Sequence, residues 1–171
     1  MTAPANVVRF HQDGQTASFK VEGRGTMHQS SPLRRQAEAC LLAGTLRINV
    51  DLRDCVYMDS TFLGTLLLLN KQLGDRQGRF SLVAPSQACT KLLRQMGLDD
   101  YLSEHADAVS PTTGWSELPT SVHDSQTMRS TVEQAHQELA GLPGKSGAQF
   151  EEVLRCMNRS TPPTDPKKPP S

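Results

Sequence analysis

The chain has 171 residues, which is enough for one domain of ordinary size and an extension. Its 18 basic and 18 acidic side chains balance, so the strongly positive field of a nucleic-acid-binding or anionic-membrane-binding protein is absent, and we expect proteins or small molecules as partners. No run of sequence approaches the roughly 20 apolar residues of a membrane span, and we predict no membrane segment.

A β-hairpin is predicted at the start of the chain. Asp13-Gly14 separates two short runs, and in the second run Ala17, Phe19 and Val21 alternate with polar residues. Because an Asp-Gly pair suits a tight two-residue turn, the two runs are expected to pair as antiparallel strands.

A first helix is expected over residues 31–42, and a strand over residues 45–52. Ser31 is the expected cap of this helix, Pro32 falls in its first turn, and Gly44 follows its end. In the strand, apolar residues alternate strictly with polar ones, which predicts one buried face and one polar face.

The most apolar part of the chain follows, and it is predicted to be the most buried helix, from about Thr61 to Leu73. A short strand at 79–85 and a helix at 86–97 come next. Strands thus alternate with helices through this part of the chain, and the pattern predicts an α/β domain over residues 1–105.

The last third of the sequence has a different character. Residues 106–122 are polar, contain two prolines and show no period, so they are predicted to be a linker. Two helical patterns within 123–158 predict a helical hairpin that either covers the sheet of the α/β domain or mediates self-association. Residues 159–171 carry five prolines and are predicted to be disordered.

Asp59, Ser60 and Thr61 stand where an extended segment meets the apolar helix. Backbone N–H groups lack partners at a helix start, and a serine hydroxyl there caps the helix, worth about 1 kcal/mol over alanine. A helix start also tolerates an anion, so a phosphoryl group on Ser60 would be carried without unfolding the domain. It would add about −1.5 to −2 charge beside Asp59. The residues alone leave two roles open for Ser60, a helix cap and a charge switch on a binding surface.

A family resemblance rests on two stretches, LRDCVYMDSTFLGTLLLLNK (52–71) and PSQACTKLLRQMGLDDYL (85–102). They resemble the STAS domain of bacterial anti-sigma factor antagonists, in which an acid, a phosphorylatable Ser or Thr and a second hydroxyl precede Gly-Leu-Gly. The residues that match this hallmark are Asp59, Ser60, Thr61, Leu63 and Gly64. The resemblance spans about residues 6–104 and implies a STAS-like mixed β-sheet with packed helices.

The resemblance implies a regulatory protein–protein interaction module and no enzyme activity. Its partner would be an anti-sigma factor that is itself a serine kinase, and the phosphoacceptor would be Ser60, with Thr61 as the second candidate. The unphosphorylated protein would bind this kinase and free the sigma factor, thereby regulating transcription. The partner-binding surface is expected to comprise Asp59, Ser60, Thr61, Phe62 and Thr26.

Two positions depart from the family pattern. Phe62 stands where the family usually has glycine after the two hydroxyls, and Thr26 stands where it often has an aspartate near the phosphosite. Both favour an alternative function: a STAS scaffold, sensor or transport-accessory module that is not phosphorylated and in which Ser60 only caps its helix.

Other motifs carry less weight. GLPGKSG (141–147) contains Gly-Lys-Ser but lacks the glycine spacing and the preceding strand of a phosphate-binding loop. The four cysteines and five histidines show no ligand spacing, so we expect no metal, no other cofactor and no disulfide. Cys89 falls on the apolar stripe of its helix, which favours a core position over a nucleophile near His105. Residues 1–14 lack a signal-peptide pattern, and we expect a cytoplasmic protein.

Overall fold

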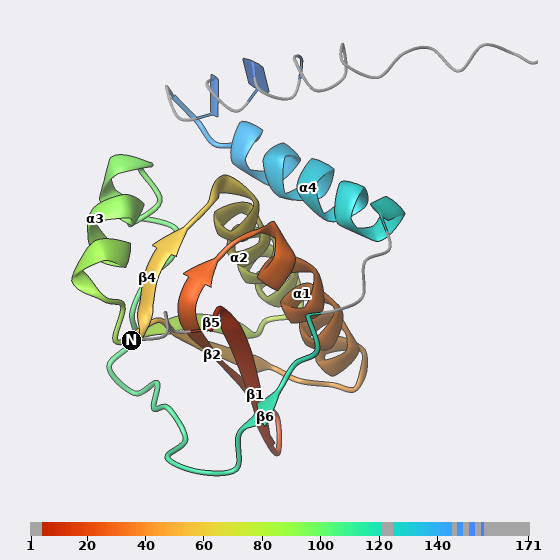
Figure 1. The fold of residues 1–171 in the computed structure, drawn as a ribbon, viewed down its shortest axis with the longest axis vertical. Helices are drawn as coiled ribbons and strands as arrows, with labels where there is room; N and C mark the ends of the chain where they lie inside the picture. The colour runs from red at the N-terminus through yellow and green to blue at the C-terminus, as the bar shows by residue number, and fades with distance from the viewer. Residues whose placement is uncertain (1–4, 121–124, 145–146, 149–150, 153–154, 156–171) are drawn as a thin grey trace, which may run out of the picture.

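The computed structural model describes residues 5–120, 125–144, 147–148, 151–152 and 155. Within these residues the chain forms an α/β fold of six strands and four helices (Figure 1). The strands are β1 (Val7–Asp13), β2 (Thr16–Gly25), β3 (Arg47–Asp51), β4 (Cys55–Met58), β5 (Arg79–Val83) and β6 (Ser116–Glu117). The helices are α1 (Met27–Leu42), α2 (Ser60–Asp75), α3 (Gln87–Gln95) and α4 (Ser125–Ala140). The α/β prediction is confirmed.

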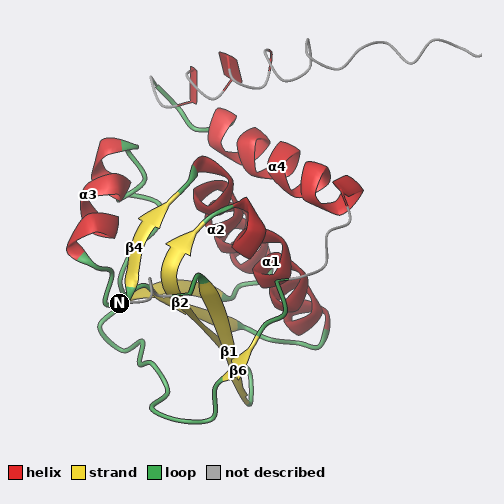
Figure 2. Cartoon of the chain, in the orientation of Figure 1, coloured by secondary structure: helices red, strands yellow, loops and turns green. Residues whose placement is uncertain are grey.

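The sheet is mixed, with the strand order β5-β3-β2-β1-β6. Figure 2 shows its strands in yellow beside the helices in red. β1 and β2 form the predicted antiparallel hairpin around Gly14, whose positive φ of 55° suits glycine. β3 and β5 run parallel to the first half of β2, while β4 pairs in parallel with its second half after a register shift at Gly23/Arg24. This shift brings the ends of β2 and β4 together, and α1 and α2 begin directly after these two ends.

The hydrophobic core lies between the sheet and helices α1 and α2. The apolar helix predicted from Thr61 to Leu73 is α2, and most of its residues are buried. Its largest fully buried side chains are those of Phe62, Leu63, Leu66, Leu69 and Leu73. α3 packs beside β4 and buries Cys89 and Leu93.

Helix α1 begins four residues before the predicted cap. Its N-cap is Thr26, which accepts from the backbone of His28, and the Gln29 side chain accepts in return from the Thr26 backbone N–H. Because this capping box satisfies the first orphan donors, the helix starts at Met27 and Pro32 lies inside it. The expectation that Ser31 caps this helix is therefore corrected.

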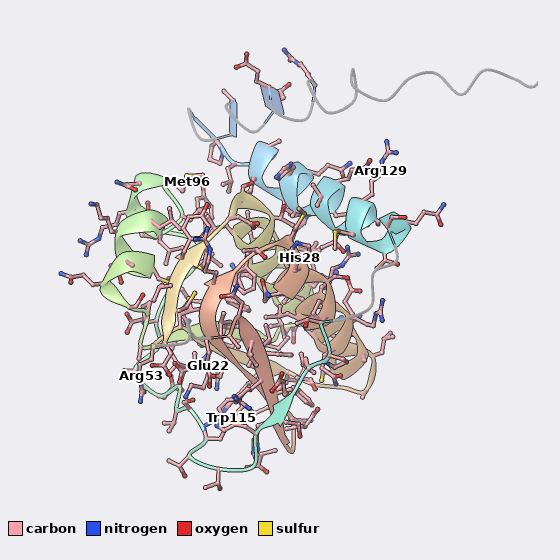
Figure 3. The ribbon with its side chains drawn as sticks, in the orientation of Figure 1. Glu22, His28, Arg53, Met96, Trp115 and Arg129 are labelled. Carbon is pink, nitrogen blue, oxygen red and sulfur yellow. The ribbon has the colours of Figure 1, made fainter. Side chains whose placement is uncertain are left out.

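The segment predicted to be a linker returns to the sheet. Leu82 of β5 pairs with Glu104, and β6, inside the predicted linker of residues 106–122, pairs antiparallel with β1. Leu118 is buried in the core, and the ring centres of Trp115 and of His11 on β1 lie 6.0 Å apart. Figure 3 labels Trp115. Residues 103–120 thus contact both edges of the sheet, β5 through Glu104 and β1 through β6. The sequence gives no sign of this, because the segment has no long apolar run.

The first helix of the predicted C-terminal hairpin is α4, and it packs on α2 and α1 (Figure 1). α4 therefore packs on the α/β domain, which is one of the two predicted alternatives, but the covered surface is that of helices α1 and α2 and not the sheet itself. The predicted second helix lies largely outside the described residues, and the proline-rich tail lies entirely outside them. In the described part of the chain, no helix combines the length and the apolar character that crossing a membrane demands.

Candidate functional site

Asp59 holds the starts of two helices together. It is the N-cap of α2, and its Oδ1 accepts from the backbone N–H of Phe62 at 2.8 Å. Its Oδ2 accepts from the backbone N–H of Met27, the first residue of α1, at 2.9 Å. The backbone N–H of Asp59 in turn donates to the carbonyl of Gly25 at the end of β2. One carboxylate therefore satisfies orphan donors of both helices and joins α1 to α2.

Thr26 lies beside this junction as the cap of α1. Its hydroxyl donates to Gln29 Oε1 at 2.6 Å and accepts from the backbone N–H of His28 at 3.3 Å. Thr26 precedes Met27, whose N–H is held by Asp59, so the structure places Thr26 and Asp59 at the same junction. Both side chains are engaged in capping.

Ser60 is the first residue of α2, and its side chain is half-buried. Its Oγ lies at hydrogen-bonding distance, 2.9 Å, from Nε2 of His136 on α4. His136 is 7% exposed, and burial lowers the pKa of its imidazole, an effect that the nearby Asp59 carboxylate opposes. The structure thus joins the predicted phosphoacceptor to a residue 76 positions away.

His136 could not be found from the sequence pattern. His136 shows no metal-ligand spacing with the other histidines or the cysteines. A histidine that bonds to a distant serine leaves no local signal, because its partner is set by how α4 packs on α2.

Thr61 and Phe62 point away from the surface. Thr61 is 5% exposed and Phe62 is fully buried. A Cβ atom on Gly25 would lie 2.9 Å from the Phe62 ring, so glycine at the end of β2 makes room for this ring. In this conformation neither side chain offers its surface to a partner.

Gly64 allows α4 to approach α2 closely. A Cβ atom on Gly64 would collide with the carbonyl group of Ala135, lying 2.6 Å from its carbon and 2.8 Å from Ala135 Cα. Gly64 has no positive φ, so its role is close packing and not an unusual backbone conformation. The glycine that matches the family hallmark is therefore the crossing point of the two helices.

Exposed side chains flank the junction on β4. Tyr57 is 40% exposed and Val56 59% exposed, and both lie just before Asp59. The guanidinium carbon of Arg24, on the neighbouring β2, lies 4.3 Å from the centre of the Tyr57 ring. Met27, at the start of α1, is 37% exposed. Val56, Tyr57 and Met27 are thus exposed apolar side chains close to the residues that form the Ser60 junction.

The other candidate chemistry finds little support in the described residues. Cys89 is fully buried, and its thiol donates to the carbonyl of Cys55 at 3.4 Å. A hydrogen bond with Cys89, together with burial, raises the pKa of the Cys55 thiol. In the part of the chain that the structure describes, no cluster of three metal-ligating side chains occurs. Lys145 of the Gly-Lys-Ser motif lies outside that part.

Comparisons with known proteins agree with this fold. The family described as "Mlab, STAS domain" matches residues 8–104. A STAS-domain containing protein of Pseudomonas aeruginosa (strain UCBPP-PA14) is 33% identical over 81 residues, which make up 47% of this chain and 79% of that protein.

Two solved structures share the fold at low sequence identity. The anti-sigma factor antagonist SpoIIAA in its unphosphorylated form matches with a TM-score of 0.52 at 20% identity, covering 58% of this chain and 89% of SpoIIAA. The NMR structure of the protein TM1081 matches with a TM-score of 0.52 at 18% identity, covering 56% of this chain and 78% of that protein. The family match covers more than half of the chain, and the chain therefore belongs to the STAS domain family.

Proposed function

We propose that this protein is a regulatory binding module that acts like an anti-sigma factor antagonist in the cytoplasm. Its partner is an anti-sigma factor with serine kinase activity, and the docking surface centres on the start of α2. Ser60 is the phosphoacceptor, and phosphorylation releases the partner. The SpoIIAA-like fold supports the class of protein.

The position of Ser60 carries this proposal. Ser60 is the first residue of α2, and its side chain is half-buried, whereas the neighbouring Thr61 is 5% exposed. Of the two hydroxyls in the motif, that of Ser60 is therefore the one nearer to solvent. The proposal accordingly prefers Ser60 to Thr61 as the acceptor.

A phosphoryl group fits the chemistry of this position. Transfer from ATP forms a bond between Ser60 Oγ and the γ-phosphorus, breaks the bond to the bridging oxygen of ADP, and passes the hydroxyl proton to a base of the kinase. The new anion stands at the positive end of α2, where unpaired N–H groups favour negative charge. It also stands beside the Asp59 carboxylate, so the local negative charge becomes large.

The exposed surface beside Ser60 explains how added charge would act. Met27, Val56 and Tyr57 present apolar surface next to the junction. A partner that buries this surface would also have to desolvate the phosphoryl group, which is costly unless the partner pairs it with cations. Phosphorylation therefore weakens docking.

The second candidate function is a scaffold that binds its partner without phosphorylation. It is favoured by the contacts of the motif itself: Asp59 and Thr26 cap helices, and Ser60 Oγ is hydrogen-bonded to His136. In this function the acid and the hydroxyls stabilise the junction, and the exposed surface alone binds the partner.

Phosphorylation in vitro separates the two functions. The purified protein is incubated with Mg-ATP and the anti-sigma serine kinases of its own genome, and its intact mass is measured. We expect one phosphoryl group on the wild type, none on Ser60→Ala, and one on the matched control Thr61→Ser. Binding to the same kinase should weaken at least about tenfold in Ser60→Asp. Tight binding that Ser60→Asp leaves unchanged, with no phosphoryl group on any variant, would identify the scaffold.

A further inference from the structure

Helix α4 packs against α2 (Figure 1). Its contacts there begin at Ser60, the first residue of α2. Three contacts define this packing: Ser60 with His136 at 2.9 Å, Gly64 with the backbone of Ala135, and Lys71 Nζ with Glu138 Oε1 at 3.6 Å. Ser60, Gly64 and Lys71 are spaced four and seven residues apart, so they share one face of α2. The three contacts join positions within residues 60–71 of α2 to residues 135–138 of α4.

The contact with α2 is well packed. Ala135 and Leu139, spaced four residues apart on α4, are 1% and 0% exposed. At the crossing point Gly64 has no side chain, so the two backbones come together without a gap. α4 thus excludes other proteins from the face of α2 that includes Ser60 Oγ.

The contact with α1 is looser. An open groove of about 650 Å³ runs between α1 and α4, and Arg34, Glu38 and Ser130 are among the residues that line it. Lys71 is 64% exposed, and an ion pair as exposed as the one it makes with Glu138 contributes little to stability. α4 is therefore held mainly along one strip of α2, which limits what must be broken to detach it.

We propose that α4 is an intramolecular lid on the Ser60 site, and that a protein partner binds the α2 strip only after α4 has detached. The inference rests on the proposed function for the identity of the partner. The lid itself rests on the contacts of Ser60, Gly64 and Lys71 with α4. In the closed state His136 is hydrogen-bonded to the Ser60 hydroxyl, which a kinase has to reach. The partner then competes with α4 for the same face of α2. This competition would regulate partner binding independently of phosphorylation.

The substitution Gly64→Ala tests the lid in the full chain. The new methyl group would collide with the Ala135 carbonyl and push α4 off α2, while alanine favours helix α2 itself. Gly74→Ala is the matched control, because it makes the same change in the same helix at a site with nothing within 4 Å. His136→Ala is a second test variant, which removes the bond to Ser60 without adding volume.

Two measurements report on the lid without any partner. In the first, hydrogen exchange of the α4 amides is compared among the wild type, Gly64→Ala and Gly74→Ala, with protection of β2 and β3 as the check that the fold is kept. In the second, Ser60→Cys is added to each background, and the rate of N-ethylmaleimide labelling at position 60 is followed by peptide mass. We expect both rates to rise about tenfold or more in Gly64→Ala and to stay at the wild-type level in Gly74→Ala. If Gly64→Ala loses the protection of β2, the comparison is made with His136→Ala, for which we expect a smaller rise in the same direction.

Equal rates in the test and control variants would overturn the lid. The kinase assay then distinguishes the lid from the proposed function. Faster phosphorylation of Gly64→Ala than of Gly74→Ala supports both. If position 60 is exposed in Gly64→Ala but the two variants are phosphorylated equally fast, the lid does not control access and the inference is wrong. If no variant accepts phosphate although exposure differs, the proposed function fails and the lid stands.

Discussion

Asp59, Ser60 and His136 connect three helices within a few ångströms. Asp59 caps α2 and holds the first N–H of α1, and Ser60 bonds to His136 of α4. The acid in the motif is therefore fixed by two backbone donors, whereas the hydroxyl is held by an imidazole, a group whose charge depends on pH. At the scale of single residues, Asp59 holds the starts of α1 and α2 in place, and the contact between Ser60 and His136 depends on pH.

The charge state of His136 predicts a pH dependence. Burial lowers its pKa from the ordinary value of 6.5, so the folded state binds this proton less readily than the unfolded state. Neutral His136 therefore contributes fully to the free energy of unfolding above about pH 6.5. This contribution is lost as the pH falls through the lowered pKa of the folded state. We expect the free energy of unfolding, measured with urea, to fall more between pH 7.5 and 5 in the wild type than in His136→Gln. A constant difference between the two proteins over this range would contradict a neutral His136 in the fold.

At the scale of the elements, side-chain caps decide where the two central helices begin. α1 starts at Met27 because Thr26 and Gln29 form a capping box, although Pro32 later removes a donor from the helix. α2 starts at Ser60 because Asp59 accepts from Phe62. Both starts meet at the end of β2 and β4, so local capping places Thr26 and Asp59 together.

A pair of alanine substitutions tests which hydroxyl caps α1. Thr26→Ala removes the capping box, and we expect the free energy of unfolding to fall by about 1 to 2 kcal/mol. Ser31→Ala serves as the control, because Ser31 lies inside the helix, and its effect should stay within about 0.5 kcal/mol. Urea unfolding at constant pH measures both values. The opposite ranking would place the start of α1 at Ser31 after all.

At the scale of the whole molecule, the chain builds successive layers. The sheet lies under α1 and α2, and α4 lies across these two helices. The connection between α3 and α4 first returns to the far edge of the sheet as β6, next to β1. The segment that enters α4 is therefore attached to the STAS fold, and the sequence boundary at residue 105 is not where contacts with the sheet end.

Leu118 tests this attachment. It is 8% exposed and belongs to the core, so Leu118→Ala should lower the free energy of unfolding by about 2 to 3 kcal/mol. Val109, which is 74% exposed in the same segment, is the matched control, and Val109→Ala should change stability by less than about 0.5 kcal/mol. Denaturant unfolding followed by circular dichroism gives both values. A free linker would leave the two variants equally stable.

Much of the fold could be predicted from the sequence. The alternation around Ala17, Phe19 and Val21 predicted β2, and the apolar run after Thr61 predicted α2 with a shift of one or two residues at its ends. Asp59 at a strand-to-helix transition indicated a helix start, which the structure confirms. These features depend on neighbours two to four residues apart, and such spacings can be read directly from the sequence.

Only the tertiary structure decided what surrounds Ser60. Its bond to His136 and the contact of Gly64 with Ala135 join positions more than 70 residues apart. Likewise, β6 has two residues and pairs only because the chain passes β1. The sequence by itself determined β1, β2, β3 and β5 of the sheet, the buried helix α2 and the hydroxyl at the start of that helix. The packing of α4 decided whether this hydroxyl faces solvent, because burial between distant segments depends on the path of the whole chain and not on any local pattern.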